Sequence, residues 1–531
     1  MTPASPTRIR RSLVELQNDH AAGNPKPLDD LMRAWKGIKE LNYNDHRSFF
    51  NLGGYHGEPF RGAGWADSTF WGGYCNHGNV LFPTWHRIYC LKIEQALQSI
   101  PGCEDVMLPY WDETAPETLS NGIPTALTDE RYTFADGQTI ANPLRSFVFP
   151  VKIADHVTSD HSVYTKPAGY ETVRYPLSGL VGTPQDVANT LAHNAQFPDY
   201  QQNVGYLNQN IIRWLNHDYK DGQDKPMGVY QEFVQCLEAP NYTVFSNTTS
   251  AQEWNDKSEN EGRPVMPLEQ PHNDIHLATG GFDVPFLSPH EFSPIRGANG
   301  DMGENDTAAL DPIFYFHHCN IDRIFWLWQK RHNAVDQLEI IEYYPGTNSS
   351  DNQGATPGVA PNTWLSLDTP LLPFRQGPDG SWPNYTSRDC FNIETQLGYT
   401  YSPGSLEELA APALLAAAPA AQAASPKTLH VSRINKAPMK GSFIVVASAE
   451  VEGKMQVVGY KSVLNRWDSG FCVNCQMHME VKAAFPLTLL NAAALTAENV
   501  TIELITRDHN APQATKLAAL VAEKPYRVEI R

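Results

Sequence analysis

The chain has 531 residues, enough for two to four domains with a large buried core. Its hydrophobic content of 41% and aromatic content of 11% indicate a well-packed globular protein and exclude a disordered or fibrous chain. The net charge of -19, from 40 basic and 59 acidic side chains, would repel nucleic acids and anionic membranes, so we expect small neutral or cationic partners instead.

The compartment is inferred from the chain start and the cysteines. The sequence holds no apolar run of about 18 residues that could span a membrane. The basic residues near the N-terminus are not followed by the apolar segment of a secretory signal. Eight cysteines are few for this length, which argues against a disulfide scaffold. We therefore expect a cytoplasmic protein.

Residues 1–402 are expected to be mainly helical, with long irregular loops. Apolar residues that recur every 3.6 positions predict the clearest helices at 28–40, 86–99, 205–218 and 311–331. In the last of these, Asp311 can cap the N-terminus and Pro312 occupies the first helical position.

The composition changes abruptly after residue 402. Residues 403–426 are rich in Ala and Pro, which favours an exposed linker, with a short Ala-rich helix as the alternative. Residues 427–531 alternate apolar and polar side chains in short runs separated by turn signals: TLHVSRI, SFIVVASAEV, MQVVGYKSVL, VTIELITRD and YRVEIR. This pattern predicts a small antiparallel β-sandwich or barrel as a second domain.

Two groups of histidines stand out among the 18 in the chain. The first group, in GGYHGEPF and CNHGNVLFPTWHR, consists of His56, His77 and His86. The second group, in PHNDIH and DPIFYFHHCNIDR, consists of His272, His276 and the pair His317–His318. Residues four apart share a helix face, so His272 and His276 would project together. Two sets of neutral imidazoles without a carboxylate or thiolate suit copper or zinc.

Each histidine motif alone is a weak signal, because most such pairs lie on a surface or in a core without a metal. Their combination is more specific. Burying so many imidazoles without a common purpose would require a hydrogen-bond partner for each of them.

The combined pattern resembles the tyrosinase family of type-3 copper proteins. HGNVLFPTWHRIY is similar to the family's first copper-binding segment, and HNDIH followed by DPIFYFHHCNIDR is similar to the second. The resemblance implies an antiparallel four-helix bundle that holds two copper ions. It implies that one copper is bound by His56, His77 and His86, and the other by His272, His276 and His318.

The same resemblance assigns roles around the ligands. His317 would be a neighbour of the site, Phe82 would pack beside a ligand ring, and Asp322 would orient His318 or its surroundings. Cys75 stands two positions before His77, where similar fungal, plant and mollusc proteins carry a cysteine–histidine thioether bond. We expect that bond here; the alternative is an ordinary buried cysteine.

The resemblance implies a phenol oxidase that uses O2 to hydroxylate monophenols and to oxidise o-diphenols to o-quinones. Hydroxylation needs a deprotonated phenol, whose free pKa is near 10. Similar tyrosinases hold a proton-accepting water with a glutamate and an asparagine at the positions of Glu269 and Asn273. Leu277 is small enough to leave the site open. The alternative for Glu269 is a carboxylate that only stabilises the helix start.

The C-terminal domain resembles the shielding domain of fungal proenzymes in this family. We expect the same latency here, relieved by cleavage within residues 403–426, with Trp467 or Phe471 as the aromatic plug over the coppers. Cys472 and Cys475 form a C-x-x-C that could be a redox pair, half of a zinc site or a copper(I) site. The resemblance favours the copper(I) site, in which the two cysteines would pass copper from a copper source to the catalytic domain.

Tyr399 and Tyr401 resemble the family's tyrosine motif, which would close the domain through Arg10 or Arg11; two ordinary half-buried tyrosines are the alternative. Two other classes of protein stay open at this point, an oxygen carrier with the same coppers and a dinuclear zinc hydrolase. The second normally needs bridging carboxylates, which neither histidine segment offers. A homo-oligomer also stays open.

Overall fold

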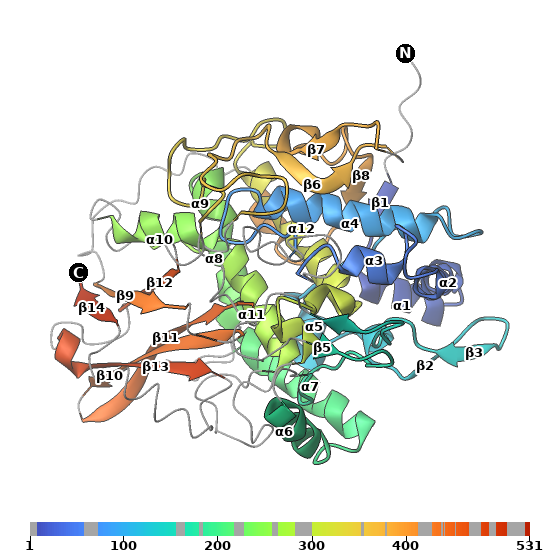
Figure 1. Cartoon of the computed structure of the whole chain (residues 1–531), viewed down its shortest axis with the longest axis horizontal. Coiled ribbons are helices and arrows are strands. Elements are labelled where there is room, and N and C mark those ends of the chain that lie inside the picture. Colours follow the sequence, from blue (N-terminus) through green and yellow to red (C-terminus); the bar gives the residue numbers. More distant parts are fainter. Residues whose placement is uncertain are drawn as a thin grey trace.

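The computed structural model describes most of the chain. The described residues are 8–57, 73–154, 165–179, 184–216, 228–257, 264–281, 300–351, 355–377, 380–411, 427–436, 439, 441–451, 453–466, 479–487, 495–506 and 526–531. Figure 1 shows a large helical part, with strands β9–β14 gathered on one side of it next to α8, α10 and α11. The predicted order, a mainly helical part followed by a β-rich part, is confirmed.

The helices of the described residues lie in the first two thirds of the chain. They are α1 (Leu13–Ala21), α2 (Lys26–Glu40), α3 (Phe49–Gly53), α4 (Phe82–Gln98), α5 (Pro116–Asn121), α6 (Pro184–Asn194), α7 (Tyr200–Asn216), α8 (Gly228–Cys236), α9 (Tyr242–Ser246), α10 (Thr248–Asp256), α11 (Glu269–Gly280) and α12 (Ile313–Arg331). Among them, none combines the length and the apolar character that a membrane span requires.

The four predicted helices correspond to α2, α4, α7 and α12, and the start of each differs from the prediction by two to five residues. The prediction that His86 opens its helix is wrong, since α4 begins a turn earlier at Phe82, with Pro83 in the first turn, where its missing N–H costs nothing. Pro312, rather than Asp311, is the N-cap of α12. Asp311 still accepts a hydrogen bond from the Ile313 N–H and forms an ion pair with Arg174.

Short strand pairs lie among the helices of the first 402 residues. They are formed by β1 (Arg8–Arg10) with β8 (Tyr399–Tyr401), β2 (Arg131–Thr133) with β3 (Thr139–Ala141), β4 (Ile153–Ala154) with β5 (Thr165–Lys166), and β6 (Pro370–Arg375) with β7 (Asn384–Thr386). The β1–β8 pair is parallel and places the start of the chain beside residue 400.

The C-terminal part forms two three-stranded antiparallel sheets. One sheet has the order β11 (Lys454–Val463), β10 (Phe443–Val451), β13 (Val500–Thr506), and the other has the order β12 (Glu480–Pro486), β9 (Thr428–Asn435), β14 (Arg527–Ile530). Every predicted β segment is a strand, and β12 is an additional one. Alternating inward side chains of both sheets build one apolar core around Leu429, Phe443 and Phe485.

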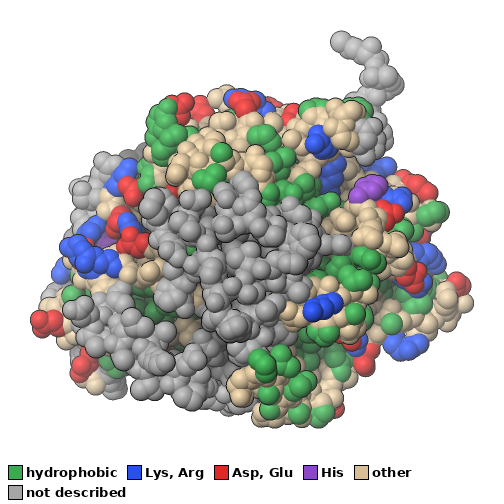
Figure 2. Space-filling view, in the orientation of Figure 1, with side chains coloured by type: hydrophobic (Ala, Val, Ile, Leu, Met, Phe, Trp, Pro, Cys, Tyr) green, Lys and Arg blue, Asp and Glu red, His purple; other side chains and the backbone are tan. Residues whose placement is uncertain are grey.

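The β-rich part contacts the helical part through a large apolar and charged interface. Ile444, Val446 and Tyr460 belong to the same apolar core as the helices. Charged side chains close the edge of this interface: Asp256, at the end of α10, accepts a hydrogen bond from Lys482 and lies near Arg531. Figure 2 shows basic and acidic side chains together at the edge where Figure 1 places β14.

The predicted linker begins as a segment that packs on α12. Residues 407–410 form a short 3₁₀ helix (Glu407–Ala410), and Leu406 is buried. Arg323 of α12 donates a hydrogen bond to the Ser405 carbonyl, and Arg331 donates to the Leu409 carbonyl. The rest of the predicted linker, residues 412–426, lies outside the described residues.

Candidate metal centre

The fold brings the predicted histidines together at the centre of the helical part. His56 follows α3, His77 lies in the loop before α4, and His86 is in α4. His272 and His276 lie one turn apart on α11, and His318 lies in α12. All six side chains are at most 2% exposed, so solvent does not satisfy their ring nitrogens.

The first set, His56, His77 and His86, forms one compact cluster. The ring nitrogens of these residues approach one another within 4.8 Å. The Nδ1–H of His86 can donate to the Phe82 carbonyl at 2.8 Å, and that of His56 to the Asn305 carbonyl at 3.2 Å. These bonds fix the proton on Nδ1, so that each Nε2 presents a lone pair to the cluster.

The second set contains the predicted His272, His276 and His318. Nε2 of His318 lies 3.2 Å from Nε2 of His272 and 3.4 Å from Nε2 of His276. The Nδ1 atoms of His272 and His276 are held at 3.0 Å by the side-chain oxygen of Asn273 and at 2.8 Å by the Met302 carbonyl. The His86 and His318 rings stack at a centroid distance of 4.5 Å, so the two sets face each other directly.

A fourth imidazole, His317, belongs to the second cluster in the structure. Its Nδ1 lies 2.6 Å from a carboxylate oxygen of Glu113, and Asn320 donates to the other oxygen of that carboxylate. His317 stacks on His272 at 5.2 Å. The structure therefore places His317 as a neighbour of the predicted ligands, engaged on one side by a buried acid.

Burial governs the protonation of all these rings. It lowers the pKa of His86 and His317 to about 3. It also lowers the pKa of the other five rings well below 6.5, with neighbouring imidazoles adding to the effect. Neutral imidazoles, which are the form that binds metals, are thus favoured throughout the cluster.

Several buried ring nitrogens have no hydrogen-bond partner among the described residues. They are Nε2 of His56, His86 and His317, both nitrogens of His77, and Nδ1 of His318. A buried polar atom without a partner is costly, and a metal ion would satisfy the Nε2 lone pairs. Imidazole nitrogens bind such ions at about 2 Å, and two ligands at a tetrahedral angle then lie about 3.3 Å apart. The 3.2 and 3.4 Å separations in the second set fit this geometry.

Phe82 and Phe314 pack against the histidines. The Asp322 carboxylate binds other side chains than the His318 ring. The Phe82 ring lies 4.8 Å from His86 and 4.9 Å from His272, as predicted. The oxygens of Asp322 accept hydrogen bonds from Arg87, Tyr399 and Tyr401. Asp322 therefore orders the surroundings of α12 and not the His318 ring itself.

The tyrosine motif closes the helical part through Arg10. The Arg10 guanidinium lies 3.6 Å above the Tyr399 ring, and its nitrogens bind Glu94 and Asp322. Arg11 pairs instead with Asp19. The prediction that an N-terminal arginine contacts these tyrosines is confirmed, and the residue is Arg10.

Glu269, the first residue of α11, ties together three segments. One of its oxygens accepts the Gly78 N–H at 2.7 Å, and the other accepts the N–H and hydroxyl of Thr248 at 2.8 and 3.0 Å. Burial raises the pKa of Glu269, and the N–H donors of Thr248 and Gly78 offset part of that rise. Gly78 follows His77, so this carboxylate also fixes the loop that carries His77.

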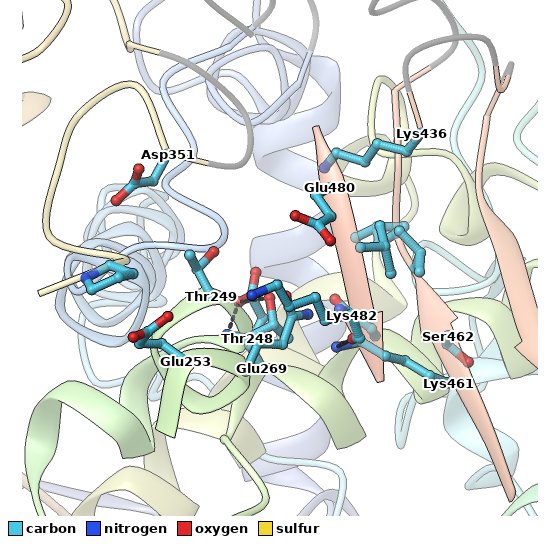
Figure 3. A pocket seen from close by; sticks show the side chains of 16 residues that line it. Thr248, Thr249, Glu253, Glu269, Asp351, Lys436, Lys461, Ser462, Glu480 and Lys482 are labelled. Atoms are coloured by element: carbon cyan, nitrogen blue, oxygen red, sulfur yellow. Dashed lines mark hydrogen bonds between the residues drawn. The ribbon is translucent and has the colours of Figure 1, made fainter. Parts of the chain in front are cut away.

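Glu269 and Asn273 line a cavity of about 220 Å³ between the helical part and the C-terminal sheets. Figure 3 shows Thr248, Glu253 and Glu269 reaching it from the helices, and Lys461, Glu480 and Lys482 from the strands. Burial lowers the pKa of two of the lining lysines, Lys436 and Lys461, to about 8. Charged groups of the C-terminal part thus lie on the same cavity as the candidate proton-accepting pair.

Cys75 is buried beside the first set, with two N–H donors on its sulfur. Arg466, after β11, donates to Sγ at 3.4 Å, and the Asn305 amide donates at 3.9 Å. The thiol forms no disulfide with another described residue and is 1% exposed. Burial raises the pKa of this thiol, although the Arg466 charge opposes the rise.

Four predicted site residues lie outside the described part of the chain. They are the plug candidates Trp467 and Phe471 and the C-x-x-C residues Cys472 and Cys475. Three neighbours of the site were not found from the sequence: Glu113, Asn305 and Arg466. Each of them reaches the histidines or Cys75 only after distant segments fold together. None belongs to a local sequence motif that would predict its contact.

Comparisons with known proteins agree with the geometry. A family model described as the common central domain of tyrosinase matches residues 46–331. The chain is similar to a tyrosinase named HcTyr2 from Hahella sp. (51% identity, covering 96% of this chain and 94% of the relative). It is also similar to a tyrosinase from Aspergillus oryzae (44% identity, covering 92% and 91%).

Solved structures give the same result for the whole fold. A tyrosinase from Burkholderia thailandensis, studied at low pH, superposes with a TM-score of 0.85 at 50% identity and covers 99% of this chain and 100% of that one. A structure of Aspergillus oryzae pro-tyrosinase has a TM-score of 0.61 at 20% identity, covering 95% and 91%, and is similar in fold. Both similarities extend over the helical and the β-rich parts.

Proposed function

Because this chain belongs to the tyrosinase family, we propose that its two copper ions are held by the two facing sets of histidines. The first copper is assigned to His56, His77 and His86, and the second to His272, His276 and His318. The observation that carries this assignment is the convergence of buried Nε2 atoms, with the rings of His56, His86, His272 and His276 fixed from the other side by carbonyl and amide oxygens.

The chain is a copper-dependent phenol oxidase with a C-terminal latency domain. It uses O2 to hydroxylate monophenols at the ortho position and to oxidise o-diphenols to o-quinones. When bound, the copper pair supplies the binding and reduction of O2. The protein's own groups hold the metals, position the phenol ring and move its proton.

The proton step is assigned to Glu269 and Asn273. The Asn273 side-chain oxygen is used by His272, which leaves its amide N–H groups for a water at the cavity. The carboxylate of Glu269 has more acceptor positions than its three observed bonds occupy. A water held between these two side chains would accept the phenol proton as the ring enters.

The helices α4, α11 and α12, which bear proposed ligands, support the expected four-helix bundle together with α2. α2 packs on α4, α4 on α12, and α12 on α11. We assign the bundle to these four helices, and the two C-terminal sheets with their shared apolar core to a β-sandwich. In this bundle Cys75 and His77 form the thioether bond expected from the family, which would hold the His77 ring in place.

The C-terminal domain is assigned to residues 427–531 and shields the cavity at Glu269. The catalytic domain ends near residue 402, and the linker covers 403–426. We expect cleavage beyond residue 411, because the preceding segment is bound to α12. An aromatic plug (Trp467 or Phe471) and copper loading through Cys472 and Cys475 complete the proposal for this domain.

The activity is tested with copper-loaded, linker-cut protein. The proposal expects oxygen uptake and quinone formation from both a tyrosine-like monophenol and a catechol. Turnover of catechol alone would refute the role of Glu269 and Asn273 in hydroxylation. Reversible O2 binding without oxidation of either phenol would refute the oxidase and favour an oxygen carrier.

A further inference from the structure

Arg466 of the C-terminal part reaches into the first histidine set and contacts Cys75, which is not one of the proposed copper ligands. Its Nη2 lies 3.4 Å from the sulfur of Cys75, although the two residues are 391 positions apart in the chain. Both side chains are nearly inaccessible, with exposures of 3% for Arg466 and 1% for Cys75. Placing a guanidinium this deep costs desolvation energy, so the contact calls for a functional reason.

The surroundings hold Arg466 in place. Its carbonyl accepts the Gly441 N–H at 3.0 Å. The preceding residue, Asn465, is bound through its own N–H to the Ser442 hydroxyl and through its amide to the Met439 carbonyl. The end of β11 is thus fixed on a neighbouring turn of the same part of the chain. The guanidinium is therefore presented from a rigid support.

The Cys75 sulfur is held from two sides. The amide of Asn305 lies 3.9 Å from Sγ. Asn305 belongs to the helical part of the chain, whereas Arg466 belongs to the C-terminal part. Asn305 also fixes the first histidine set, since its carbonyl accepts from His56 Nδ1. A cysteine side chain has three rotamers about a single bond, and directed N–H donors on its sulfur select among them. The position of Sγ is thus determined jointly by both parts of the chain.

We propose that Arg466 is a positioning residue for the maturation of the copper site: it holds the Cys75 sulfur for bond formation with the His77 ring while the C-terminal domain is docked. The inference rests on the thioether bond of the proposed function. In that step the S–H bond of Cys75 and one ring C–H bond of His77 break, and an S–C bond forms. Two electrons and two protons pass to O2, the oxidant of the established reaction, and give hydrogen peroxide.

Positioning is the part of this reaction that the protein can supply. A bond between two side chains forms only when the reacting atoms are held near contact distance, and small misplacements cost large factors in rate. The shielding domain then has a second use: the site is cross-linked while it is closed, before any phenol can enter. Cleavage would release an enzyme whose His77 is already fixed.

The test follows the cross-link by mass spectrometry. Full-length apo protein is mixed with copper and air, and the peptides that contain Cys75 and His77 are measured over time for the loss of two hydrogens. Arg466→Met is expected to cross-link about 10-fold more slowly than the wild type, or slower still, while it binds two coppers. Arg527→Met is the matched control, because Arg527 lies on β14 of the same C-terminal part but pairs with Glu529 of its own strand instead of Cys75. It is expected to cross-link at the wild-type rate.

The outcomes separate the two proposals. Cross-linking of Arg466→Met at the wild-type rate would overturn the role of Arg466. If the wild type oxidises phenols but never loses two hydrogens, the thioether assignment fails, and this inference fails with it, while the oxidase stands. Arg466→Lys, which keeps the charge without the planar guanidinium, decides the question if the methionine variant does not fold; the expected result is again slow cross-linking.

Discussion

Glu269 combines two tasks at the residue scale, and a single substitution can separate them. In Glu269→Gln the amide cannot accept hydrogen bonds at both ends, and it cannot take a proton from water. We expect monophenol hydroxylation to fall about 100-fold or more, with a much smaller loss of catechol oxidation. Steady-state rates on the two phenol classes measure this ratio.

The control for Glu269 is Glu253→Gln, on α10 and in the same cavity. It changes the charge of the cavity but touches none of the bonds that Glu269 makes to Gly78 and Thr248. The expected ratio of the two activities is that of the wild type. Equal losses of both activities in Glu269→Gln would instead assign the carboxylate to holding the His77 loop.

Lys436 makes the stability of the chain depend on pH. Burial lowers its pKa in the folded chain to about 8, below the ordinary value of 10.5 in the unfolded chain. Between these values the unfolded chain binds more protons, so the free energy of unfolding rises with pH. Relative to Lys436→Met, the wild type should gain about 2 kcal/mol between pH 7 and 9.5. Chemical denaturation at both pH values measures the difference; a constant offset would contradict the pKa shift.

The proposed ligand histidines could be predicted from the sequence because their spacing is local. His272 and His276 are one helical turn apart, and His86 and His318 lie within strongly patterned helices, so the motifs need no knowledge of the fold. Glu113 and Arg466 differ from these residues. Their contacts join segments more than 200 positions apart, and no local pattern in a sequence encodes such a pairing.

At the scale of elements, strong periodicity predicted the helices and strands. Their first and last residues were predicted less accurately, because the local signals there are weak. α4 starts four residues earlier than expected, because Pro83 fits the first turn of a helix as well as a loop. β12 was missed because its alternation is broken by two consecutive alanines, Ala483 and Ala484. The strands β1 and β8 were not predicted. The contact between their side chains, an N-terminal arginine and the two tyrosines, was predicted.

The β1–β8 pair is stabilised by the buried network around Arg10. Arg10→Met would leave Glu94 and Asp322 short of a buried cation, and breaking such a pair costs about 3–5 kcal/mol. A corresponding fall in the free energy of unfolding is expected in denaturation of the catalytic part. Arg8→Met is the matched control on the same strand. Among the described residues, the Arg8 side chain makes only a distant, exposed contact with Asp105, and little change is expected there.

At the scale of the whole molecule, charged contacts add to the apolar contacts that dock the C-terminal domain on the helical part. Asp256 accepts a hydrogen bond from Lys482 at 2.7 Å, and Arg531 donates to its carbonyl at 2.8 Å. Asp256→Asn removes the charge that holds both cations. We expect the uncut chain to oxidise catechol several-fold faster than the wild type, because the shield opens more often.

Two controls define this effect on latency. After cleavage of the linker, Asp256→Asn and the wild type should be equally active, since the shield is then gone. Asp368→Asn, which pairs with Arg388 on the exposed surface of the catalytic part, should leave latency unchanged. An uncut Asp256→Asn chain as inactive as the wild type would place the main docking energy in the apolar contacts alone.

The most direct test of the whole account is the number of copper ions bound per chain, measured by elemental analysis of the purified protein. Two coppers are expected for the wild type and one for either His86→Ala or His318→Ala, because each substitution removes a proposed ligand from a different set. A wild-type chain with one copper or none, or a loss of both ions in each variant, would contradict two independent histidine sets.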